Sequence, residues 1–221
     1  MPVTDVKKKL YVAVDVDGTL TRSNVSFAFG RFLYQKGVIS CFQAFLPALY
    51  YGAHLIGLLS VVMLHRFIFW TLFLGRKKEV VEAAVDEFLA TQAHHLIRPS
   101  IKEEIVSLQA EGARVALLSS SPDFLVKGLC SILALEEWHA TEYVVDTAGC
   151  FTSVGRVVTG SVKAEIVRNV KKSQGTKTMA MTDSMLDSPL FEEVDTVVAV
   201  CPDRALKRLA CKKGWRVVFG E

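Results

Sequence analysis

Charged side chains are nearly absent from one long stretch of this 221-residue sequence. Between residues 37 and 75, Arg66 is the only aspartate, glutamate, lysine or arginine. The part from 37 to 65, if helical at about 1.5 Å per residue, is long enough to cross the ~30 Å apolar layer of a bilayer. Pro47 and two glycines interrupt it, so we expect two shorter helices instead of one straight span.

Paired cysteines and a strong excess of one charge are missing as well. The five cysteines are scattered, odd in number and without a C-x-x-C pair, which argues against a disulfide framework or a zinc site and favours a reducing compartment. With 26 basic and 23 acidic residues, the net charge of +3 gives no reason to expect a nucleic-acid partner. The apolar run after Lys7, Lys8 and Lys9 is broken by Asp15 and is too short for a signal peptide, so we expect a cytoplasmic protein.

Outside the uncharged stretch, short apolar runs alternate with amphipathic segments. We expect strands at 10–14, 114–119, 178–182, 196–200 and 215–219, with one or two more within 142–159 and helices between them. This alternation predicts an α/β fold, a Rossmann-like parallel sheet with helices on both faces. We assign that core to residues 1–24 and 98–221, and an all-helical insertion after the first strand to residues 25–97. The pattern Ser100-x-x-Glu103 predicts a capping box at the start of a helix.

The first expected strand ends at a candidate site. It leads directly into Asp15-Val16-Asp17-Gly18-Thr19, which places two carboxylates and a glycine at the strand end. Gly18 permits a sharp turn and a close approach of a ligand to the backbone. An ordinary solvated Asp-Gly turn would explain an isolated motif of this kind. The motif indicates a functional site only if the rest of the chain supplies further polar residues to join it.

Two other expected strands also end at polar residues. Ser119 ends one of them, and Asp183 ends the other with Asp187 four residues later. Because the carboxyl ends of parallel strands meet at one edge of a sheet, Asp15, Asp183 and Asp187 are expected to form an oxygen-rich pocket that suits Mg²⁺. Lys163, in the first turn of a downstream helix, offers a fixed positive charge. A metal, carboxylates, a hydroxyl and a lysine together suit phosphoryl transfer.

Taken in order, these motifs resemble the haloacid dehalogenase superfamily of aspartate-nucleophile phosphatases. The sequence has D-x-D-G-T at 15–19, the strand-terminal Ser119, Lys163, and T-D-x-x-x-D at 182–187. The S-x-S-P form at 119–122 and the ending P-D-R-A-L-K-R-L-A-x-x-x-G-W at 202–215 resemble the phosphoserine-phosphatase-like subgroup. Members of that subgroup carry a helical cap between the first two motifs, which is where residues 25–97 lie.

The resemblance implies a division of roles among these residues. Asp15 is implied to be the nucleophile that becomes an aspartyl-phosphate. Asp17 is implied to protonate the leaving oxygen and then to activate water. Ser119 is implied to hold phosphoryl oxygens and Lys163 to stabilise the transition-state charge, although Lys171, Lys172 and Lys177 also lie downstream.

The same resemblance implies a magnesium site and substrate contacts. Asp183, the Asp15 carboxylate and the Asp17 backbone carbonyl are implied to bind Mg²⁺, with Asp187 in support. Thr19, Arg22 and Ser120 lie in or beside the motifs and are candidate substrate contacts together with Ser119.

The segment after the first motif departs from the phosphoserine phosphatases. Those enzymes usually carry an acid there to meet the substrate's ammonium, whereas Thr21 to Ser26 contains Arg22 and no acid. Phosphoserine or another small metabolite is therefore the alternative substrate. Some members of the subgroup act on phosphatidylglycerol phosphate, which makes a lipid phosphate the preferred hypothesis. A non-catalytic binding module is a second alternative, disfavoured because both acids of the first motif are intact.

The uncharged stretch raises the question of a membrane. A single crossing would separate Asp15 from Asp183, so the stretch is expected to be a buried cap bundle, a re-entrant hairpin or a pair of interfacial helices. A cap of this size has too little interior to bury all of its apolar side chains, and exposed apolar surface usually marks a partner or a membrane. The basic clusters at Lys7–Lys9 and Arg76–Lys78 could meet anionic headgroups at the inner face.

Overall fold

The computed structural model describes residues 10–220, so the predicted headgroup contact of Lys7–Lys9 lies outside the described residues. In chain order the elements are β1 (Leu10–Val14), α1 (Val25–Gln35), α2 (Cys41–Leu55), α3 (Val61–Leu72), α4 (Lys78–Leu96), α5 (Pro99–Ala110), β2 (Arg114–Pro122), α6 (Asp123–Ile132), β3 (Glu137–Thr141), β4 (Tyr143–Val145), β5 (Phe151–Val154), α7 (Gly160–Gln174), β6 (Lys177–Thr182), the 3₁₀ helix η1 (Met185–Asp187), α8 (Ser188–Phe191), β7 (Thr196–Val200), α9 (Arg204–Lys213) and β8 (Arg216–Val218).

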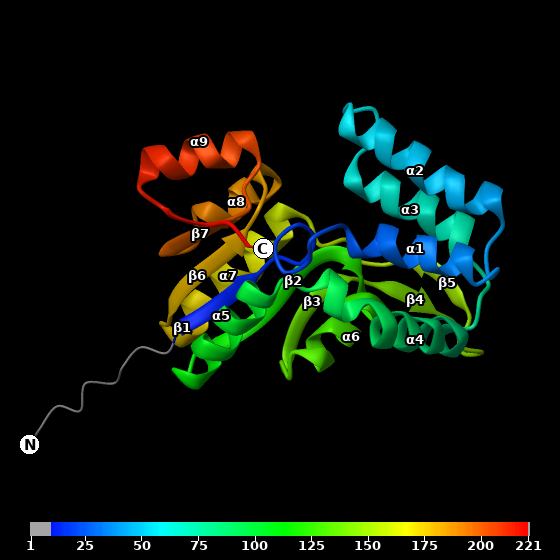
Figure 1. Cartoon of the computed structure of the whole chain (residues 1–221), viewed down its shortest axis with the longest axis horizontal. Coiled ribbons are helices and arrows are strands. Elements are labelled where there is room, and N and C mark those ends of the chain that lie inside the picture. The colour runs from blue at the N-terminus through cyan, green and yellow to red at the C-terminus, as the bar shows by residue number, and fades with distance from the viewer. Residues whose placement is uncertain (1–9, 221) are drawn as a thin grey trace, which may run out of the picture.

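The predicted parallel sheet is confirmed. Within the described residues, six strands pair in the order β3-β2-β1-β6-β7-β8, and every pairing is parallel (Figure 1). Alternate residues of the central strand β1 face opposite sides, so Val12 and Val14 join one buried cluster while Tyr11 and Ala13 join the other. Helices cover both faces, as the alternation of strands and helices requires.

Two local predictions were incomplete or wrong. Strand β3 was not expected, because Glu137-Trp-His-Ala-Thr141 shows no apolar run; it is an edge strand whose first four residues are only half buried. Helix α5 starts at Pro99 with Arg98 as its N-cap and no side-chain cap, so the predicted capping box at Ser100 does not form. Proline at the first helical position, where no amide hydrogen bond is needed, fixes this start instead.

Helices α1 to α4 lie together beside the core, next to the antiparallel hairpin of β4 and β5 (Figure 1). An aromatic cluster joins them: the rings of Phe69 and Phe73 from the α3 region lie 5.2 and 5.5 Å from Tyr143 of β4. Phe124 of α6 lies 5.6 Å from the same ring and 5.3 Å from Phe73. Such contacts bury large areas of ring and fix the helices relative to the sheet.

The uncharged stretch forms two helices, α2 and α3, as predicted. Pro47 and Gly52 lie inside α2 and do not end it, and the break follows at Gly57, whose φ is +79°. Much of the outer surface of this α2–α3 hairpin is apolar and exposed: Phe42 is 69% exposed, Trp70 58%, and Ile56 and Leu58, in the turn between the helices, 73% each. Among the described residues, no helix combines the length and the apolar character that a bilayer crossing requires.

Candidate active site

The ends of β1 and β6 place two of the predicted acids at the same edge of the sheet. Val14 lies beside Met181 in the parallel register, and the Asp15 amide continues the ladder by donating to the Met181 carbonyl at 2.9 Å. Asp183 directly follows β6. Both acids therefore lie at the carboxyl ends of neighbouring strands, where open α/β sheets bind their ligands.

Lys163 connects this edge of the sheet to Asp187. It lies in the first turn of α7, and its Nζ is 2.6 Å from Asp15 Oδ1 and 2.9 Å from each carboxylate oxygen of Asp187. The Thr182 hydroxyl donates to Asp187 Oδ2 at 2.8 Å. The lysine and Asp187 are buried, so these ion pairs are shielded from water.

The downstream lysines that the sequence left open lie elsewhere. Lys171 pairs with Asp195 at 2.6 Å on the exposed side of α7, and Lys177 is exposed at the start of β6. Lys163 is therefore the lysine of that region that contacts Asp15.

Gly18 allows the loop after β1 to lie against Asp183. Its φ is +83°, in the left-handed region that glycine adopts without strain, and a Cβ at this position would lie 2.2 Å from Asp183 Oδ2. The neighbouring Thr19 hydroxyl is 3.4 Å from Asp15 Oδ2 and 3.5 Å from Asp183 Oδ1. One buried hydroxyl thus lies between the two carboxylates.

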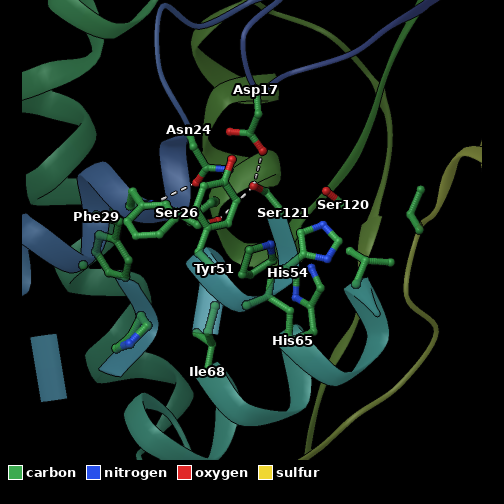
Figure 2. Close-up of a pocket in the computed structure, with 18 of the residues that line it drawn as sticks. Asp17, Asn24, Ser26, Phe29, Tyr51, His54, His65, Ile68, Ser120 and Ser121 are labelled. Atoms are coloured by element: carbon green, nitrogen blue, oxygen red, sulfur yellow. Dashed lines mark hydrogen bonds between the residues drawn. The ribbon is translucent and has the colours of Figure 1, made fainter. Parts of the chain in front are cut away.

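Asp17 is held from two sides. Its Oδ1 accepts a hydrogen bond from the Val25 amide at 2.6 Å, and its Oδ2 accepts one from the Ser121 hydroxyl at 2.7 Å. The Ser121 hydroxyl also lies 2.9 Å from that of Ser26 (Figure 2). Val25 and Ser26 are in the first turn of α1, so the carboxylate is anchored both to β2 and to the first cap helix.

Ser121 was assigned no role from the sequence. The S-x-S-P motif drew attention to these serines, but nothing in it showed which one reaches Asp17. Ser119 is buried, its hydroxyl accepts from the Ser121 amide at 3.0 Å, and it does not line the cavity described below. Ser120 does line that cavity (Figure 2). The phosphoryl contact of Ser119 stays a prediction, and Ser120 is the neighbour better placed to make it.

Arg22 is placed away from the site, contrary to the sequence-based expectation. Its side chain is exposed and does not line the cavity, while its amide donates to the Leu96 carbonyl at 2.8 Å. That hydrogen bond belongs to the junction where the end of α4 returns beside the loop after β1. The structure gives this predicted substrate contact no support, and it stays a prediction.

Burial controls the ionisation of the acids at this edge. It raises the pKa of Asp15 from 3.8 to about 8, with Lys163 lowering the value and Asp187 raising it. Burial also raises the pKa of Asp183, from 3.8 to about 6, and Asp187 adds to the effect. The pKa of Asp17 is raised by burial, although its hydrogen bonds lower it. A nearby cation would favour the charged forms of these carboxylates.

The donor atoms at this edge fit magnesium. Asp15 and Asp183 present carboxylate oxygens on either side of Thr19, and the Asp17 carbonyl follows in the same loop. Magnesium prefers such hard oxygen ligands and keeps several waters. Within residues 10–220 no group of three acidic, histidine or cysteine side chains is arranged as a metal site by itself, and the set expected from the sequence needs only two carboxylates together with the Asp17 carbonyl. The Asp187 carboxylate, which we expected to support the metal, is engaged by Lys163.

A cavity of about 710 Å³ extends from these acids into the cap (Figure 2). Five charged side chains line its inner end, namely Asp15, Asp17, Lys163, Asp183 and Asp187. Its outer part is lined mostly by apolar and aromatic residues of the cap and its neighbours: Phe27, Phe29, Ile39, Ala44, Pro47, Ala48, Tyr51, Val61, Leu64, Ile68, Leu72, Phe73, Leu125 and Tyr143. A substrate whose reacting group sits at the acids would have the rest of its body among these side chains.

Comparisons with known proteins agree with this arrangement. The sequence model of the haloacid dehalogenase-like hydrolases matches residues 12–192. The chain is 32% identical over 212 residues to a Streptomyces azureus protein named for inhibition of morphological differentiation, covering 92% of this chain and 76% of that protein. It is 26% identical over 215 residues to a histidinol-phosphatase of Neisseria meningitidis, covering 92% and 96%. A solved structure of a phosphoserine phosphatase with an analogue of its phospho-aspartyl intermediate superposes with a TM-score of 0.70 at 23% identity, covering 96% and 94%.

Proposed function

The chain belongs to the haloacid dehalogenase-like hydrolases, and on that premise we propose that it is a magnesium-dependent phosphatase acting through an aspartyl-phosphate on Asp15. The observation that carries the proposal is the contact of Lys163 Nζ with Asp15 Oδ1 at 2.6 Å. That contact brings together two motifs far apart in the sequence and provides a buried carboxylate with a fixed cation. An ionised carboxylate is the form that acts as a nucleophile.

In the first step, an oxygen of Asp15 attacks the phosphorus of the monoester. The bond from phosphorus to the leaving oxygen breaks, and that oxygen takes the proton held by Asp17. Burial raises the pKa of Asp17, which favours the protonated form that this step needs. Lys163 stays close to the reacting carboxylate and offsets the negative charge that gathers there.

In the second step, Asp17 removes a proton from water. The water oxygen attacks the phosphorus of the aspartyl-phosphate, which releases inorganic phosphate and regenerates the Asp15 carboxylate. The Ser121 hydroxyl and the Val25 amide hold Asp17 in one orientation for both steps. Asp183, Asp15 and the Asp17 carbonyl would hold Mg²⁺, which supplies positive charge next to the phosphoryl oxygens.

The cavity favours a lipid phosphate among the candidate substrates. Its outer walls are apolar, and the hairpin that forms part of them exposes apolar side chains on its other surface, as an interfacial cap would. Phosphoserine is the alternative, in line with the name of the superposed structure. In the described part of the chain, however, the cavity lining holds no acid beyond those at its catalytic end to meet an ammonium group.

Phosphate release from a panel of esters tests the proposal. Wild type and the Asp15→Asn variant would be assayed on phosphoserine, a sugar phosphate and phosphatidylglycerol phosphate in detergent, with Mg²⁺ or with a chelator. We expect Mg²⁺-dependent release by wild type and none by Asp15→Asn, whereas Asp86→Asn, on the exposed face of α4, should match wild type. Release that persists in Asp15→Asn would rule out the nucleophile. Wild type that binds these esters but hydrolyses none would instead support the non-catalytic binding module.

A further inference from the structure

Two histidines interrupt the apolar part of the cavity. His54 is on α2 and His65 is on α3, and both line the cavity on the side that faces Ser120 and Ser121 (Figure 2). Neither belongs to a motif of the family resemblance. Each ring makes a hydrogen bond through Nδ1, and those bonds decide what each Nε2 offers to a ligand.

His54 offers an acceptor. Its Nδ1 lies 2.7 Å from the Leu59 carbonyl oxygen in the turn between the two helices. A carbonyl oxygen can only accept, so the ring hydrogen is assigned to Nδ1. In the neutral ring Nε2 then carries a free lone pair.

His65 offers a donor. It is 8% exposed, and its Nδ1 lies 3.5 Å from the Tyr143 hydroxyl, for which the described residues provide no other acceptor. We therefore assign the hydroxyl as the donor to Nδ1 and place the ring hydrogen on Nε2. Burial, with His54 nearby, lowers the pKa of His65 to about 4, so the ring is neutral at physiological pH.

The surroundings of the pair contain little charge. Among the described lining residues, the charged ones are the five at the catalytic end and Arg31, whose side chain is exposed. An ammonium or carboxylate beside the histidines would thus be desolvated without an opposite charge there, which is unfavourable. An uncharged group that both donates and accepts a hydrogen bond, such as a hydroxyl, matches the donor of one ring and the acceptor of the other.

We propose that His54 and His65 form a specificity site for an uncharged hydroxyl on the apolar leaving group of the substrate. The inference rests on the proposed phosphatase function and narrows its substrates to monoesters whose leaving alcohol has a free hydroxyl and a largely apolar body. One Nε2 donates to the hydroxyl oxygen and the other accepts its hydrogen. Two hydrogen bonds of ordinary strength correspond to discrimination of about tenfold or more against an ester that lacks the hydroxyl.

Matched esters test the site. The kcat/KM of the wild-type protein would be measured for plain alkyl phosphates from ethyl to octyl, for the same series with a terminal hydroxyl, and for a series with a terminal ammonium. At one chain length, we expect the kcat/KM for the hydroxyl ester to exceed that for the plain alkyl ester and that for the ammonium ester by about tenfold or more. In His54→Leu and His65→Leu this ratio should fall towards one, while His94→Leu, an exposed histidine of α4, should keep it.

The outcomes separate this inference from the proposed function. The specificity site is overturned if the protein hydrolyses the esters with no preference for the hydroxyl at any chain length, or if it prefers the ammonium series. Either result leaves the proposed phosphatase function intact. Hydrolysis of none of these alkyl esters also overturns the specificity site, and the phosphatase itself is overturned only if phosphoserine, the sugar phosphate and phosphatidylglycerol phosphate are not hydrolysed either. His65 is buried, so circular dichroism checks that His65→Leu is folded. If it is not, His54→Leu, at a half-exposed position, carries the test alone.

Discussion

At the residue scale, Gly18 is the position where the smallest change should have the largest effect on the site. A methyl group there would lie 2.2 Å from Asp183 Oδ2 and force that carboxylate away from Thr19 and Asp15. We predict that Gly18→Ala lowers kcat by about a hundredfold or more, the scale reported for losses of site geometry, and weakens Mg²⁺ binding. Steady-state kinetics with a magnesium titration measure both.

Gly112 offers a matched control for this change. Its φ is also +83°, and a Cβ there would meet nothing within 4 Å. Gly112→Ala should therefore show the same backbone strain, about 1–2 kcal/mol in the free energy of unfolding, with unchanged kcat. If both variants lost stability equally and kept full activity, the close approach of Gly18 to Asp183 would have no catalytic importance.

Ser121 opposes the effect of burial on the ionisation of Asp17. Its hydroxyl donates to Oδ2 at 2.7 Å and lowers the pKa of Asp17 against the effect of burial. Removing that donor destabilises the carboxylate, so in Ser121→Ala the limb of the pH–kcat profile that reports Asp17 should move to higher pH. Ser26→Ala, which leaves the bond to Asp17 in place, should move it less; equal profiles in wild type and Ser121→Ala would contradict the role.

At the scale of elements, the α2–α3 hairpin is the part of the cap most exposed to a partner. Ile56 and Leu58, in the turn between its helices, are each 73% exposed. Arg66 is the only charged residue of the surrounding stretch 37–75. If the cap lies on a membrane, Ile56→Ser with Leu58→Ser should lower the partition coefficient on anionic liposomes, measured by co-sedimentation, by about a hundredfold or more, since each buried apolar side chain contributes about 1.5–3 kcal/mol.

The control for the hairpin lies on the core. Val106 of α5 is 54% exposed, so Val106→Ser removes exposed apolar surface away from the cap and should leave liposome binding unchanged. Wild-type protein that stays monodisperse without detergent and does not sediment with anionic liposomes would refute the membrane contact.

Elements were predictable where the pattern of side chains was strong. The interrupted uncharged run predicted a helical hairpin, and apolar runs predicted β1, β6 and β7. Strand β3 was not predicted because an edge strand does not need an apolar run. Its pairing with β2 holds it in place. The start of α5 was misjudged because Pro99 at the first helical position competes with a capping box at Ser100.

At the scale of the whole molecule, the crowded acids should link stability to pH and magnesium. The pKa of Asp183 rises from 3.8 to about 6 on folding, so the metal-free folded chain keeps a proton that the unfolded chain releases above about pH 4. Stability from this group is therefore full below about pH 4 and is lost as the pH rises to about 6. Because Mg²⁺ needs the ionised form, it should raise the Tm more at about pH 8 than at about pH 5.

Thermal unfolding with Mg²⁺ and with a chelator measures this linkage. Asp183→Asn carries no titrating proton, so its Tm should lack this part of the pH dependence and respond little to Mg²⁺. A Tm of wild type that gains equally from Mg²⁺ at both pH values, or an equal gain in Asp183→Asn, would remove Asp183 from the metal site.

The site was predictable in part for reasons of topology. Asp15 and Asp183 directly follow buried parallel strands, so the sheet alone brings them together, and Lys163 follows from the helix that precedes β6. The hydrogen bond of Ser121 to Asp17 and the exposure of Arg22 were not predictable from the sequence. Each depends on the direction of a side chain, at a strand end for Ser121 and in a loop for Arg22. The contact of His65 with Tyr143 depends on how the cap packs on the β4–β5 hairpin, which no local pattern encodes.

The central claim is that the phosphoryl group passes through Asp15, and acid quenching during turnover tests it most directly. Protein incubated with Mg²⁺ and the best ester would be quenched, digested and mapped by mass spectrometry, with borohydride to convert an acyl phosphate to homoserine. We predict phosphate, or homoserine after reduction, at Asp15 in wild type. Phosphate on a serine or histidine, or turnover with no modification of Asp15 under any quench, would contradict the account.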